Sequence, residues 1–81
     1  MSRQNLIRMA NRIGDFFEAM PDRDRALEDI VDHIRKFWEP RMRHDMLDHL
    51  DREGGGGLSD IVLTALTRHR ATLMENSSPG A

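Results

Sequence analysis

Hydrophobic residues recur every three or four positions along most of this chain. That spacing places them on one face of an α-helix. No segment shows the alternation of apolar and polar residues that is typical of a β-strand. The first such stretch ends at Pro21, because proline supplies no amide donor and its ring clashes with the preceding helical turn. A second stretch runs to Trp38, and a third begins at Pro40, a residue well suited to the first position of a helix.

Capping residues and glycines mark the boundaries of these stretches. Asp22 and Ser59 are good N-cap residues, and the four glycines at 54–57 end the third stretch and are expected to form a flexible connection. The short Pro-Asp turn after the first stretch predicts an antiparallel helical hairpin. The pattern therefore predicts an all-α fold, a small bundle of about four helices, at residues 5–20, 22–38, 40–52 and 59–74.

A chain of 81 residues makes one domain with a modest core. We expect a single helical domain over residues 1–74. Residues 75–81 are polar and small, lack an apolar anchor and are expected to be a disordered tail. Gly14 lies inside the first helical pattern, where glycine costs about 1 kcal/mol relative to alanine, so we expect close helix packing there.

Charge and composition exclude several classes of function. Twelve Lys and Arg residues against fourteen Asp and Glu give a net charge of −2, whereas a nucleic-acid binder normally has a strongly basic face. Cysteine is absent, so we expect neither a disulfide nor an ordinary iron–sulfur cluster in this chain. No apolar run approaches the ~20 residues of a membrane span, and the amino terminus lacks the apolar stretch of a secretory signal.

No pattern in the sequence predicts a catalytic, cofactor-binding or metal-binding residue. The histidines do not pair at the spacing that puts two imidazoles on one helix face, although a mixed site of Asp45 and His49 is an alternative. The acidic residues of the second helix alternate with arginines, which is typical of a solvated face. No serine lies in a nucleophile motif, and the glycine run lacks the Lys-Ser/Thr of a phosphate loop.

The segment at residues 33–43 is the most informative part of the chain. It contains the only tryptophan and two of the four aromatic residues, and tryptophan and arginine dominate binding hot spots. The alternative interpretation is that the two aromatic residues close the core while the cations are solvated. Both interpretations are correct if one ring faces the core and the other faces a partner. The residues predicted to form a partner interface are Arg35, Phe37, Trp38, Pro40, Arg41 and Arg43.

A second basic feature lies near the amino terminus. Arg3, Arg8 and Arg12 precede the first acidic residue, Asp15, and Arg8 and Arg12 share one helix face. A docking surface and a contribution to solubility explain this feature equally well.

Four segments, in this order, resemble a known family. They are Ile7–Phe17, Met20–Arg23, His33–Arg43 and His49–Asp51, the last followed by a glycine-rich link. Over about residues 5–70 the chain resembles the delta subunit of soluble NAD-dependent formate dehydrogenase. The Phe-Trp-x-Pro-Arg-Met-Arg block is the most specific part, and the four-glycine link is longer or richer in glycine than usual.

The resemblance implies a place in a cytoplasmic multisubunit enzyme that oxidises formate to carbon dioxide and reduces NAD+. In such complexes the alpha subunit carries a molybdenum (or tungsten) bis-guanine-dinucleotide cofactor and iron–sulfur clusters. The beta and gamma subunits carry FMN, NAD and further clusters, and the delta subunit has no assigned redox centre. The chain would then be a non-catalytic accessory subunit that docks on the alpha subunit, and through it on the beta and gamma subunits.

Two functions from different classes follow. The first is an accessory subunit that supports assembly, stability or molybdenum-cofactor loading of the alpha subunit, without nucleic-acid or membrane partners. The alternative is a free helical regulator that binds nucleic acid through Arg35, Lys36, Arg41 and Arg43. The charge balance disfavours the alternative, because phosphate contacts need a net basic surface.

Overall fold

The structure is a computed structural model, and it describes residues 2–74. These residues form five α-helices and no strand, which confirms the all-α fold. The predicted tail at 75–81 lies outside the described residues. The helices are α1 (Arg3–Glu18), α2 (Arg23–Phe37), α3 (Pro40–Glu53), α4 (Asp60–Arg68) and α5 (Arg70–Met74).

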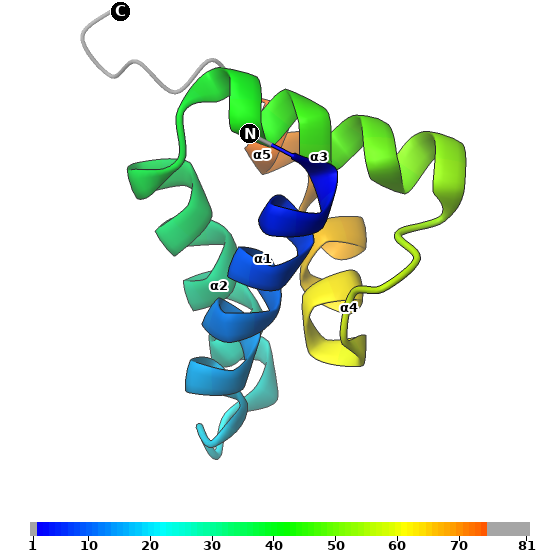
Figure 1. Cartoon of the computed structure of the whole chain (residues 1–81). Helices are drawn as coiled ribbons and strands as arrows, with labels where there is room; N and C mark the ends of the chain where they lie inside the picture. The colour runs from blue at the N-terminus through cyan, green and yellow to red at the C-terminus, as the bar shows by residue number, and fades with distance from the viewer. Residues whose placement is uncertain (1, 75–81) are drawn as a thin grey trace, which may run out of the picture.

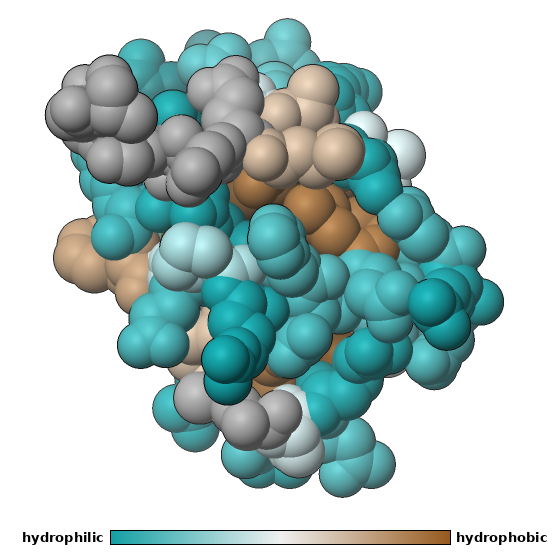
Figure 2. Space-filling model, turned by 90° about the horizontal axis from the view of Figure 1, so that it is seen from above, coloured by the Kyte–Doolittle hydropathy of each residue, from teal (hydrophilic) through white to brown (hydrophobic). Residues whose placement is uncertain are grey.

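The helices pack around α1 and α2. These two run side by side in opposite directions as the predicted hairpin, α3 crosses one end of the pair (Figure 1), and α4 packs against both α1 and α2. The shared core contains buried side chains from all five helices. The face over α3 is largely hydrophilic, with hydrophobic side chains visible in a hollow (Figure 2).

The helix boundaries follow from local capping. Ser2 accepts a hydrogen bond from the Asn5 amide at 3.2 Å, so α1 begins two residues earlier than expected. Asp22 caps α2 by accepting from the Arg25 amide at 3.1 Å. Gly54 ends α3 in the left-handed region at φ 66°, a conformation that glycine adopts without steric cost.

The last predicted helix is divided in two. His69, with φ −109° and ψ 27°, leaves the helical conformation between α4 and α5. The break redirects the chain so that α5 contacts α2 and α3 as well as α4, and it buries Leu73 in the core. The expectation of one continuous helix was therefore wrong, because burial against distant helices outweighs the local periodicity.

The glycine loop is anchored at several points and is not a free spacer. His49 Nε2 lies 2.8 Å from the carbonyl oxygen of Gly56. Asn11 on α1 donates from Nδ2 to the carbonyl oxygen of Gly57 at 2.9 Å, and its Oδ1 accepts from the Ser59 amide at 2.9 Å. One asparagine therefore links the end of the loop and the start of α4 to α1.

Candidate partner interface

Phe37 and Trp38 face in opposite directions at the junction of α2 and α3. The Trp38 side chain is 5% exposed and belongs to the core, whereas Phe37 is 71% exposed. Trp38 also ends α2, where its amide donates to the carbonyl oxygen of Ile34 at 2.9 Å. Trp38 therefore fixes the chain against the core, while the preceding residue, Phe37, projects outward.

The cations of this segment differ in the same way. Arg43 is 4% exposed, Arg35 is half-buried, and both have interaction partners. Lys36 forms an ion pair with Asp32 at 3.0 Å. Arg41 is exposed, and within residues 2–74 no hydrogen bond or ion pair engages it. The segment lacks the continuous free basic surface that phosphate contacts require, which weakens the nucleic-acid alternative.

Pro40 contributes to this arrangement through the backbone. It occupies the first turn of α3, and the preceding Glu39 is extended at φ −66° and ψ 152°, as expected before proline. The sharp change of direction between α2 and α3 leaves Pro40 and Arg41 exposed beside Phe37 in the sequence. The predicted interface at these residues stays a prediction, and burial directs it to Phe37, Pro40 and Arg41.

A row of four rings continues from Phe37 onto α1. The ring of Phe37 lies 4.7 Å from that of His33, and the His33 ring lies 6.5 Å from that of Phe17. Phe17 in turn packs edge-on against Phe16 at 5.0 Å, with an interplanar angle of 89°. We call Phe16, Phe17, His33 and Phe37 the aromatic row. It joins the second half of α1 to the second half of α2.

Phe16 is exposed although it belongs to the helical pattern of hydrophobic residues in α1. It is 76% exposed, whereas Phe17 is half-buried against the core. Adjacent residues on a helix point about 100° apart, but both can still be buried, as Ile30 and Val31 are in this core. The sequence therefore contained no clear signal that the Phe16 ring is exposed.

The three arginines near the amino terminus also separate into two kinds. Arg3 ties α1 to α3 through Asp48 at 3.1 Å and Glu53 at 3.0 Å. Arg8 and Arg12 are exposed, and among residues 2–74 neither has a hydrogen bond or an ion pair. The sequence placed these two on one helix face, and the structure leaves that face uncompensated.

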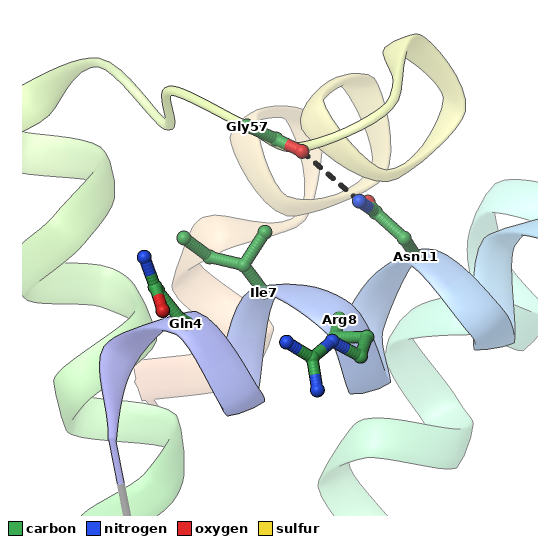
Figure 3. Close-up of a pocket in the computed structure, with 5 residues that line it drawn as sticks. All are labelled: Gln4, Ile7, Arg8, Asn11 and Gly57. Carbon is green, nitrogen blue, oxygen red and sulfur yellow. Dashed lines mark hydrogen bonds between the residues drawn. The ribbon is translucent and has the colours of Figure 1, made fainter.

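Two surface hollows flank Arg8. One is lined by Gln4, Ile7, Arg8, Asn11 and Gly57. Figure 3 shows Ile7 and Asn11 of this group directed toward the glycine loop, and Arg8 extending away from it. The second hollow is lined by Asn5, Arg8, Met9 and Arg12.

The histidines and acids form no metal site in the described part of the chain. Within residues 2–74 no three His, Asp or Glu side chains are grouped to hold an ion. His49 is 3% exposed and directs its Nε2 to the carbonyl oxygen of Gly56, so one of its nitrogens is engaged in holding the loop. None of the described helices is long and apolar enough to cross a membrane.

A helical core with exposed aromatic rings at Phe16 and Phe37 and with uncompensated arginines is typical of a small helical protein that binds other proteins. Comparison with protein families gives a match over residues 5–66, from α1 into α4, to the NADH-dependent formate dehydrogenase delta subunit, FdsD. The chain belongs to this family, which confirms the resemblance inferred from its sequence. Comparisons with curated proteins and with solved structures gave no match.

Proposed function

We propose that this chain is the non-catalytic delta subunit of a cytoplasmic NAD-dependent formate dehydrogenase. In this proposal it docks on the catalytic alpha subunit and supports that subunit's assembly, stability or molybdenum-cofactor loading. Family membership supports the identity of the complex. The observation that carries the docking role is Phe37, 71% exposed beside a tryptophan that is 5% exposed.

The docking residues are held in place before a partner binds. Trp38 is held in the core and ends α2, so the neighbouring Phe37 and Arg41 project from a fixed turn between two helices. Docking groups that are already positioned lose less conformational entropy when they bind. Removing a phenylalanine side chain from water contributes about 1.5–3 kcal/mol, and the exposed Arg41 at the start of α3 can add directed hydrogen bonds.

The redox chemistry belongs to the partner subunits in this proposal. A chain without cysteine cannot supply the thiolates of an ordinary iron–sulfur cluster. The molybdenum or tungsten bis-guanine-dinucleotide cofactor and clusters would be held by the alpha subunit, and FMN, NAD and further clusters by the beta and gamma subunits.

A small helical subunit can act on assembly by mass action. A protein that binds the folded alpha subunit and not its unfolded form shifts the equilibrium toward the folded, loadable state. At 100-fold excess over the dissociation constant, this stabilisation is about 2.7 kcal/mol.

The test is to purify the enzyme from cells with and without this chain and to measure metal content and activity together. We expect deletion to lower the amount of assembled, metal-loaded complex while formate turnover per bound metal changes little. Complementation with the wild-type chain should restore the loaded complex, and complementation with Phe37→Ala should restore less of it. Equal metal content with a collapse of activity per metal would instead assign the chain a role in catalysis or electron transfer.

A further inference from the structure

We propose that the exposed face of α1 extends the docking surface and receives an acidic, partly apolar segment of the partner protein. This face, which we call the α1 surface, is formed by Arg8, Arg12 and Phe16. The inference rests on the proposed function and adds the chemistry of the partner segment.

The three residues form one stripe along the helix. Positions 8, 12 and 16 are each four apart, and side chains at that spacing are neighbours on a helix face about 5–6 Å apart at their β-carbons. All three are exposed. At 1.5 Å per residue the stripe is ~12 Å long, which is the length of a short extended segment or two turns of a helix.

The charge of the α1 surface is unmatched within the described chain. Elsewhere the protein pairs arginines with its own carboxylates across helices, as in Arg68 with Asp24 at 3.2 Å and Arg70 with Asp51. Arg8 and Arg12 have no such partner among residues 2–74. Guanidinium groups bind carboxylates through paired, charge-assisted hydrogen bonds, so the complementary segment is acidic.

The stripe also borders one apolar side chain, that of Met9. The hollow between the two arginines is lined by Asn5 and Met9 as well, and Met9 packs against the core. A polar, charged rim around an apolar centre is the usual anatomy of a protein interface. A segment that combines carboxylates with one apolar side chain therefore fits this hollow better than a phosphate backbone does.

Phe16 connects the stripe to the interface already proposed. It is 76% exposed and begins the aromatic row, which leads through Phe17 and His33 to Phe37. The ring contacts thus link the two exposed phenylalanines, Phe16 on α1 and Phe37 on α2. Arg12 lies one helical turn from Phe16, so a partner that covers both phenylalanines would lie next to the arginines.

The test measures binding of the purified chain to immobilised formate dehydrogenase complex that was assembled without it. We expect Arg8→Gln/Arg12→Gln to weaken binding about tenfold or more and to reduce the dependence of the dissociation constant on salt. The matched control is Arg25→Gln/Arg52→Gln, which removes the same charge from two arginines that pair with Asp29 and Asp48. This control should bind within about twofold of wild type.

A second pair of variants tests the apolar part. Phe16→Ser should weaken binding about tenfold or more, whereas Met74→Ser, at an exposed methionine on α5, should bind within about twofold of wild type. Circular dichroism of each variant checks that the helices are intact. Charge reversal at both arginines should abolish binding, and an Asp or Glu to Arg change in the partner segment should restore it in part.

The outcomes separate the two proposals. If the wild-type chain binds and both Arg8→Gln/Arg12→Gln and Phe16→Ser bind equally well, the α1 surface is wrong and the docking function stands. If the wild-type chain does not bind the complex, the docking function itself fails. Binding of duplex DNA, or a dimer of this chain, that the arginine variant abolishes would assign the surface to another occupant and overturn the inference.

Discussion

Gly14 of α1 lies so close to Val62 of α4 that a β-carbon at position 14 would be 2.5 Å from the Val62 Cγ2 atom. The same β-carbon would be 3.1 Å from Cγ2 of Ile61. Only glycine permits this approach, which confirms the close packing expected from its place in the helical pattern. The contact holds α4 against α1 one turn away from Asn11, the residue that binds the glycine loop.

We expect Gly14→Ala to destabilise the fold. Overpacking of a tight contact costs about 1–3 kcal/mol, and the better helix propensity of alanine offsets about 1 kcal/mol of that. Chemical denaturation should therefore show a net loss on the order of 1 kcal/mol. Gly56→Ala is the control, because its β-carbon would meet only the Glu53 carbonyl oxygen at 3.8 Å. A Gly14→Ala variant as stable as wild type would refute the close contact.

The two hydrogen bonds by which Asn11 links the glycine loop and α4 to α1 can be tested separately. Asn11→Ala removes both, and at about 0.5–1.5 kcal/mol each the expected loss is ~1–3 kcal/mol of unfolding free energy. Asn11→Asp keeps an acceptor for the Ser59 amide but loses the donor to Gly57. Amide hydrogen exchange at Ser59 should accelerate in the alanine variant and stay slow in the aspartate variant. Unchanged exchange in Asn11→Ala would show that the link is unimportant.

Periodicity and capping predicted the helices well, because both depend on residues close in sequence. They could not predict the break at His69, since Leu73 continues the apolar spacing of α4 and only distant contacts with α2 and α3 favour the redirected turn. The anchoring of the glycine loop was also missed. Its partner Asn11 lies 46 positions before Gly57 in the sequence.

The candidate interface was also predictable only in part from the sequence. Its location around Phe37 came from composition, but which ring faces inward depends on how α3 leaves α2. The sequence pattern suggested that Arg43 is one of several surface cations, and it did not predict that Arg43 is buried. Likewise, the freedom of Arg8 and Arg12 emerges only when the ion pairs of the other arginines are known.

The purified chain alone is expected neither to oxidise formate nor to reduce NAD+. Its sequence offers no thiolate for a cluster and no recognisable cofactor motif. The measurement is NADH formation with formate and NAD+ by the isolated, metal-free protein, with the complete complex as the positive control. Formate-dependent NADH from the isolated chain would contradict the assignment of the activity to the complex.

Substitution of Trp38 should reduce stability far more than substitution of Phe37. Trp38→Ala removes a core side chain and is expected to cost about 3–5 kcal/mol, a large part of the total stability of a small domain. Trp38→Phe is the milder variant, which should remain folded with a smaller loss. Phe37→Ala changes an exposed ring and should shift stability by less than about 0.5–1 kcal/mol in chemical denaturation.

Binding should show the reverse order. Phe37→Ala and Arg41→Ala are each expected to weaken capture of the catalytic subunit, by up to about thirtyfold for a hot-spot residue, while helical circular dichroism is unchanged. Trp38→Phe should bind nearly as well as wild type once it is folded, because its ring is 5% exposed and acts by fixing the turn. Lys36→Ala is a suitable control, since that cation already pairs with Asp32. Full binding by a Phe37→Ala/Arg41→Ala double variant would place the docking site outside this segment.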